Sequence, residues 1–218
     1  QVGRILISIE SPAVLEADSR LDALLQHPRV CVTRSEANLY SSVDSALRPG
    51  SGQTLPALIT TADNPLLTAE MLAHFCAELE SAEAEAAIAM TRASVLRSRY
   101  PDGQRRFYRF RDDAYSNCNL YAIVNERAID SARVFAGGGQ FRKKALRMLL
   151  AFGPGSFLLY RLRVLTLPGL GTRLSRAFGV RVRFVDLPFP EAPIDVDNER
   201  TLRIARGILA RRESALPA

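Results

Sequence analysis

The sequence predicts an α/β protein with a three-layer, Rossmann-like architecture, in which helices cover both faces of a mainly parallel, mixed sheet. Three observations support this class. Short apolar runs alternate with longer amphipathic segments over the first ninety residues. The runs are continuously apolar, as in strands that a parallel sheet buries on both faces. The 218 residues are 47% hydrophobic, which suits a sizeable core in one domain spanning 1–218.

The first half of the chain is expected to alternate strand and helix. The strands are the apolar runs 4–9, 29–33, 55–63 and 86–91. The helices are the amphipathic segments 14–27, 38–48 and 67–85. Thr68 is the expected N-cap of the third helix, with Met71 on its buried side.

The pattern changes after Arg92. Residues 105–124 suggest two antiparallel strands around a turn at Asp112–Asp113. Further helices are expected at 126–136, in an interrupted stretch over 141–179, and at 198–213, with a strand at 180–189 before the last one.

The charge is distributed unevenly along the chain. Residues 1–90 carry 5 Lys and Arg against 12 Asp and Glu, whereas residues 131–185 carry 11 Lys and Arg and no acidic residue. Such a segment indicates either an anionic partner or a solvated basic face. Nucleic acid is disfavoured as that partner, because long Leu and Phe runs interrupt the basic residues.

The cysteines and hydropathy indicate a cytoplasmic protein. Cys31, Cys76 and Cys118 are widely spaced and form no CxxC pair, which argues against a disulfide framework or a zinc site. No apolar run reaches membrane-spanning length, and no signal peptide is visible.

Acidic residues stand at two places where ligands bind in α/β proteins. Asp63 ends the third apolar run, and ligands of open parallel sheets bind beyond the carboxyl ends of the strands. Asp195 and Asp197 are two residues apart in an extended segment and therefore point to the same side. Carboxylates from two such places suit a divalent cation such as Mg²⁺. Each acid could instead cap the helix that follows it.

Four segments resemble the MobA-like nucleotidyltransferases, the molybdenum-cofactor guanylyl- and cytidylyltransferases, in the same order along the chain. "LITTADNPLLTAEML" (58–72) resembles their strand–D-x-P–helix motif, and "APIDVDNERTLRIA" (192–205) is similar to their closing element. "RSEANLYSSVDSAL" (34–47) resembles a segment of the related cytidylyltransferases of isoprenoid synthesis. "YSNCNLYAIV" (115–124) stands where these proteins have an asparagine-containing strand beside the acceptor.

The resemblance implies a GT-A-like nucleotidyltransferase fold and the transfer of a nucleoside monophosphate from an NTP to a small-molecule acceptor, with release of pyrophosphate. It also implies roles for particular residues. Asp63 and Asp197 would be catalytic, and Asp63, Asp195 and Asp197 would hold Mg²⁺ or Mn²⁺. Ser41, Ser42 and Asp63 would bind the nucleotide, and Asn117 and Asn119 would face the acceptor.

The sequence departs from this family in lacking its N-terminal glycine-rich loop, which wraps the triphosphate. Since Gln1–Ile9 corresponds better to the family's second strand, we expect the natural protein to extend upstream. A non-catalytic nucleotide- or phosphate-binding protein remains an alternative. A GT-A-type glycosyltransferase, with Asp195–Asp197 as its D-x-D motif, is a weaker one.

A basic, apolar helical elaboration is expected over 139–180. Arg142, Lys143 and Lys144 could reach a phosphate of the NTP or of the acceptor. The apolar stretch 156–165 could pack on the sheet, form a homodimer surface, or make peripheral contact with a membrane.

Overall fold

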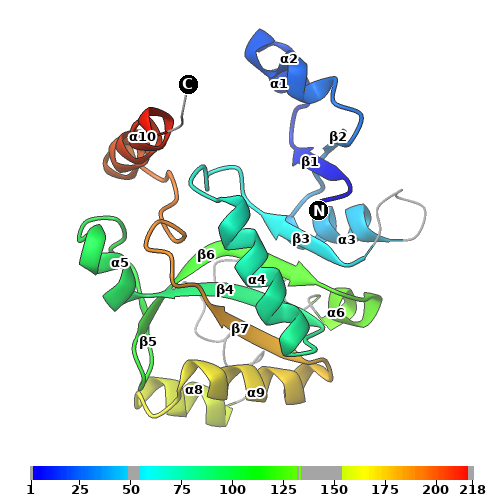
Figure 1. Cartoon of the computed structure of the whole chain (residues 1–218). Coiled ribbons are helices and arrows are strands. Elements are labelled where there is room, and N and C mark those ends of the chain that lie inside the picture. Colours follow the sequence, from blue (N-terminus) through cyan, green and yellow to red (C-terminus); the bar gives the residue numbers. More distant parts are fainter. Residues whose placement is uncertain (1, 49–54, 132, 134–153, 216–218) are drawn as a thin grey trace.

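The computed structural model describes residues 2–48, 55–131, 133 and 154–215. Its main sheet has the strand order β3-β6-β4-β7, formed by Ala57–Thr60, Ala114–Ile123, Ala86–Arg92 and Val182–Asp186, with β5 (Tyr108–Arg109) paired to β6. β6 runs antiparallel to β3, β4 and β5, while β4 and β7 are parallel. The sheet is therefore mixed, and β3, β4 and β7 all end at the same edge (Figure 1).

One face of this sheet is covered by α4 (Ala69–Ser81), which crosses it in Figure 1. Met71, Phe75 and Leu79 of α4 are buried against small residues of the strands, among them Ala87 and Ala89 of β4. Small side chains in the strands let the helix approach the sheet closely. Thr68 accepts a hydrogen bond from the Met71 N–H and begins the helix, as expected.

The opposite face packs against two groups of helices. α3 (Leu39–Leu47) and α6 (Glu126–Ser131) cover Ile59 and Ile123 of the sheet. α8 (Pro154–Arg161) and α9 (Leu167–Phe178) cover Met90 and Phe184. Helices on both faces give the three layers that the sequence predicted.

The last helix, α10 (Glu199–Ser214), packs beside α5 (Ala93–Arg99) beyond the ends of the strands (Figure 1). Ile194, just before α10, and Ala205 and Ile208 within it share an apolar cluster with Leu96 and Leu66. This cluster anchors the segment that carries Asp195 and Asp197.

β1 (Ile5–Ile9) and β2 (Val30–Arg34) form a separate parallel two-stranded sheet, joined by α1 (Ala13–Glu16), the 3₁₀ helix η1 (Ser19–Leu21) and α2 (Asp22–Leu25). No residue of these five elements is buried. The apolar runs thus predicted both strands, but this small sheet stands apart from the main one.

Two local expectations were wrong. One continuous helix was expected over 14–27, but the segment is interrupted where the Asp18 carboxylate accepts the Arg20 N–H and begins η1. α5 was not anticipated, because its seven residues are too few to show a clear helical period. In the described part of the chain, no helix is both long enough and apolar enough to cross a membrane.

Candidate functional site

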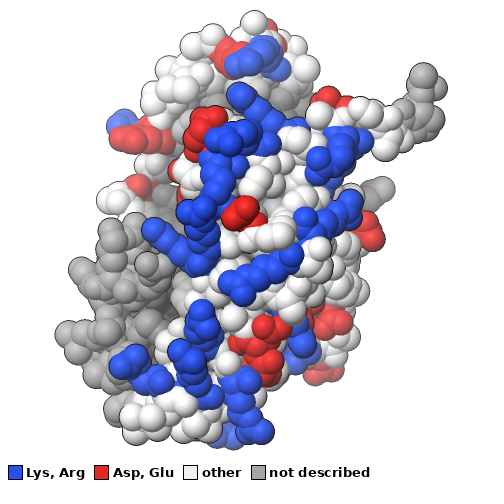
Figure 2. Space-filling model, turned by 90° about the vertical axis from the view of Figure 1, so that its left-hand side faces the viewer, with Lys and Arg blue, Asp and Glu red and all other residues white. Residues whose placement is uncertain are grey.

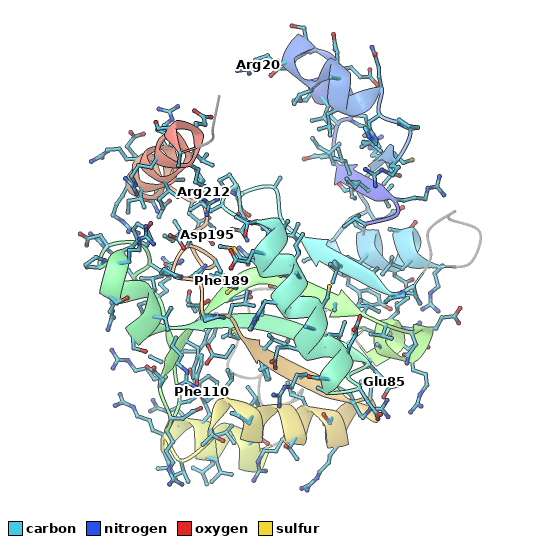
Figure 3. The ribbon with its side chains drawn as sticks, in the orientation of Figure 1. Arg20, Glu85, Phe110, Phe189, Asp195 and Arg212 are labelled. Carbon is cyan, nitrogen blue, oxygen red and sulfur yellow. The ribbon has the colours of Figure 1, made fainter. Side chains whose placement is uncertain are left out.

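Three carboxylates from two distant parts of the chain meet beyond the carboxyl end of β3. Asp63, Asp195 and Asp197 each offer an oxygen, and these oxygens lie within 4.8 Å of one another. Asp63 and Asp195 are half-buried, and Asp197 is exposed. In Figure 3, Asp195 lies in the segment between β7 and α10, near the edge of the sheet at which β3 ends.

Asp63 is positioned by a turn that follows β3. The Thr61 hydroxyl donates to its Oδ1, and its main-chain carbonyl accepts the Val196 N–H at 2.8 Å. The next residue, Asn64, is buried and donates its side-chain amide to the Cys118 carbonyl of β6 at 2.7 Å. The turn is therefore tied both to the sheet and to the segment that carries the other two acids.

Asp195 and Asp197 point the same way because the segment around them alternates. Ile194 and Val196 belong to the apolar cluster under α10, so Asp195 between them faces away from it, and Asp197, two residues on, points to the same side. The Asp197 N–H donates to Thr201 Oγ1 at 3.2 Å, and Asn198 and Thr201 form a capping box at the start of α10. The start of the helix thus fixes the position of Asp197.

The site concentrates negative charge. The pKa of Asp195 is raised because the carboxyl is partly buried and because Asp197 and Asp63 repel its ionised form. Gln104 and Asn119 each donate an amide hydrogen bond to Asp195, at 3.3 Å, which offsets only part of this cost. Such a cluster of oxygen ligands fits a small divalent cation, which would relieve the repulsion.

The asparagines predicted on β6 lie beside this cluster. Asn119, which contacts Asp195, has a left-handed backbone with φ of 50°. Asn117 donates to Asn119 Oδ1 at 3.3 Å and to the Tyr121 hydroxyl at 2.5 Å, on the face of the sheet opposite α4. The two asparagines and Tyr121 thus form a polar row on β6 that ends at Asp195.

The two serines predicted to bind nucleotide lie in α3, the helix that follows β2. Ser42 in α3 is buried, accepts the Glu36 N–H at 2.8 Å and donates to the Asn38 carbonyl. The Ser41 N–H donates to the side chain of Asn38, the N-cap of α3. A hollow of about 480 Å³ lies at the carboxyl ends of β1 and β2, lined by Glu10, Arg34, Ser35, Glu36 and Ala37. Ser42 holds the loop that lines this hollow.

Two residues that hold the carboxylates in place, Thr61 and Gln104, were not predicted from the sequence. Thr61 stands two residues before Asp63 and could have been found by asking what orients that acid. Gln104 belongs to a loop without a motif, so nothing in the sequence connects it with Asp195, 91 positions away. Arg142, Lys143 and Lys144 lie outside the described residues.

Comparison with known proteins relates this fold to transferases. No family model and no curated protein matches the chain. One solved structure that matches is a hypothetical transferase from Thermus thermophilus, with 25% sequence identity and a TM-score of 0.70. The matched region covers 84% of this chain and 76% of the transferase chain. Another is the structure of 4-diphosphocytidyl-2C-methyl-D-erythritol synthase from Anaerococcus prevotii, with 12% sequence identity and a TM-score of 0.55. The matched region covers 96% of this chain and 83% of the synthase chain.

These likenesses confirm the predicted nucleotidyltransferase-like α/β fold. The second likeness concerns the fold alone, because its sequence identity is low. The narrower assignment to the MobA-like family stays a prediction.

Proposed function

We propose that this protein is a nucleotidyltransferase that uses Mg²⁺ or Mn²⁺ to move a nucleoside monophosphate from an NTP to a small acceptor. The convergence of the three carboxylates at the end of β3 is the observation that carries the proposal. The likeness to a hypothetical transferase at 25% identity supports it, and the 4-diphosphocytidyl-2C-methyl-D-erythritol synthase shares the fold.

In this reaction an acceptor oxygen attacks the α-phosphorus of the NTP, and the bond from that phosphorus to the oxygen of the departing pyrophosphate breaks. Asp63, Asp195 and Asp197 would hold the cation, which neutralises charge on the phosphate oxygens. Thr61 and Gln104 keep two of these carboxylates in place through hydrogen bonds. The protein therefore contributes mainly position and charge, and no covalent intermediate is required.

The proposal gives each substrate its own binding region. The nucleotide would occupy the hollow at the ends of β1 and β2, whose loop Ser42 secures. The acceptor would lie along the row of Asn117, Asn119 and Tyr121, whose amides and hydroxyl suit a polar, phosphorylated or cofactor-like molecule. In this proposal the acceptor oxygen and the α-phosphate would meet at the cation.

Two measurements test the proposal. The first follows Mn²⁺ binding by electron paramagnetic resonance with the wild type and Asp63→Asn. The second follows pyrophosphate release with each NTP, Mg²⁺ and a panel of phosphorylated acceptors. We expect the substitution to weaken Mn²⁺ binding and to lower pyrophosphate release on the order of a hundredfold or more. Asp22→Asn, at an exposed position of α2, is the matched control and should change neither.

Equal Mn²⁺ binding by the wild type and Asp63→Asn would refute the metal site. Tight binding of the cation and NTP, without release of pyrophosphate from the NTP in the presence of any acceptor, would favour the alternative of a non-catalytic nucleotide-binding protein on the same scaffold.

A further inference from the structure

Helix α8 and the turn after it carry large apolar side chains on the outside of the molecule. Leu158, Leu162 and Val164 are 58%, 62% and 50% exposed. Leu162 follows the last residue of α8, and its N–H donates to the Leu158 carbonyl, so the two leucines stand one helical turn apart on the same side. Together with the exposed Arg161 and Arg163 between them, these residues form what we call the α8 patch.

The exposed side chains belong to a hydrogen-bonded segment whose other side is packed. Leu159 and Tyr160 of the same helix pack into the core beside Phe110. The Leu162 N–H donates to the Leu158 carbonyl, and the Val164 N–H to the Leu159 carbonyl, at 2.9 and 3.0 Å. Because α8 already buries its other face, the α8 patch is left for a partner outside the described chain.

The surroundings of the patch are basic. Arg109, Arg111 and Arg173 lie on the neighbouring elements, where the Arg111 N–H donates to the Leu165 carbonyl and Arg173 reaches Ser156. Within the described residues, no carboxylate lies within ion-pair distance of these three arginines or of the two in the patch. Figure 2 shows several arginine side chains at the lower end of the face on which α8 lies, with a group of acidic side chains to one side of them.

Two acidic residues stand in the turn that contacts the segment after the patch. Asp112 accepts the Tyr115 hydroxyl and the Leu167 N–H, and Asp113 accepts the Ser94 hydroxyl. Neither forms an ion pair with an arginine of the α8 patch, which presents apolar side chains among positively charged ones.

We propose that the α8 patch docks on the surface of an anionic lipid bilayer. The leucines and Val164 would enter the boundary between headgroups and acyl chains, while the arginines would remain at the lipid phosphates. A second copy of the chain fits less well. A two-fold dimer would set the same patch against itself, and the arginines of both copies would face each other without an acidic partner.

The test is co-sedimentation of the full chain with vesicles of phosphatidylcholine alone or with about 30 mol% phosphatidylglycerol. We expect binding to the anionic vesicles only, weakened when the salt concentration is raised. The double variant Leu158→Gln/Leu162→Gln should lower the partition coefficient about tenfold, and Arg161→Gln/Arg163→Gln should do so by a similar factor.

Matched controls separate a local patch from net charge and from misfolding. Val14→Gln, at a position of α1 that is 64% exposed, should leave binding unchanged. Arg203→Gln/Arg206→Gln removes two exposed charges from α10 and should have a smaller effect than the arginine pair of the patch. All variants should keep the melting temperature of the wild type, because they change exposed side chains.

Any of three results would overturn the proposal. One is failure of the wild type to bind anionic vesicles, and another is an equal loss of binding from the two arginine pairs. The third is a dimer in solution that Leu158→Gln/Leu162→Gln converts to a monomer, which would assign the patch to a second copy of the chain.

Discussion

Asp195 is a partly buried carboxyl with two other carboxylates beside it, and it is one of the three proposed cation ligands. Its pKa is raised by partial burial and by the repulsion of Asp197 and Asp63. A carboxyl group whose pKa is higher in the folded than in the unfolded state stabilises the fold below its unfolded pKa. That stabilisation is lost as the pH rises through the folded pKa. Without a cation, ionised Asp195 therefore opposes folding at neutral pH.

Asp195→Asn should accordingly raise the melting temperature at pH 7 in the presence of a chelator. The gain should vanish below about pH 4, where aspartate is protonated in both states. Added Mg²⁺ should stabilise the wild type more than the variant, because the variant has lost one oxygen anion of the cluster. Melting curves at several pH values, with and without Mg²⁺, make the comparison, and Asp22→Asn serves as control. A variant less stable than the wild type at pH 7 without cations would contradict this account.

At the scale of elements, the start of α10 links the stability of a helix to the geometry of the site. Asn198 accepts the N–H groups of Arg200 and Thr201 and so caps α10 directly after Asp197. Asn198→Ala should lower the free energy of unfolding by about 1 kcal/mol. It should also weaken Mn²⁺ binding severalfold, since the Asp197 N–H bonds to Thr201 of the same capping box.

Thr166→Ala is the comparison for this prediction. Thr166 caps α9 by accepting the Gly169 N–H, so its loss should cost a similar free energy in urea denaturation. Mn²⁺ affinity should be unchanged in this variant. If both substitutions lowered the Mn²⁺ affinity equally, the effect of Asn198→Ala on Mn²⁺ binding would come from the lower stability of the fold and not from the position of Asp197.

The elements also show which parts of the structure local sequence could predict. The apolar run of β4 predicted that strand because a strand buried in the middle of a sheet leaves a nearly continuous apolar signal. β3 and β7 lie at the edges of the main sheet and alternate in burial, and β7 was predicted from its alternation of arginine and apolar residues. The alternation in 194–197 predicted that Asp195 and Asp197 would share a side, because each step along an extended chain reverses the side chain. The separation of β1 and β2 could not be read in this way, because strand pairing joins residues far apart in the sequence.

At the scale of the whole molecule, the sheet order assembles the candidate site. β6 lies between β3 and β4, so Asn119 comes beside the turn that follows β3. The Val196 N–H then closes the site by bonding to the Asp63 carbonyl. The three parts lie in distant segments of the sequence, and no local pattern indicated that Gln104 would join them.

The two sheets should differ in their resistance to local opening. β1 and β2 contain no buried residue, and Ile5 is 44% exposed, whereas Ala89 in β4 and Leu120 in β6 are fully buried. Opening the small sheet therefore exposes little apolar surface, while opening the main sheet breaks its core. We expect the amides of β1 and β2 to exchange hydrogen for deuterium on the order of a hundredfold faster than those of β4 and β6. Mass spectrometry of peptides from each strand measures this difference.

Adding an NTP with Mg²⁺ should slow exchange at the end of β2 and in the loop after it, because the hollow proposed for the nucleotide lies there. Asp63→Asn should reduce this protection without changing the exchange of the small sheet in the absence of nucleotide. Equal exchange in the two sheets would mean that β1 and β2 are held by contacts as strong as those of the core. If adding the nucleotide left hydrogen exchange after β2 unchanged, the hollow would be excluded as the nucleotide-binding site.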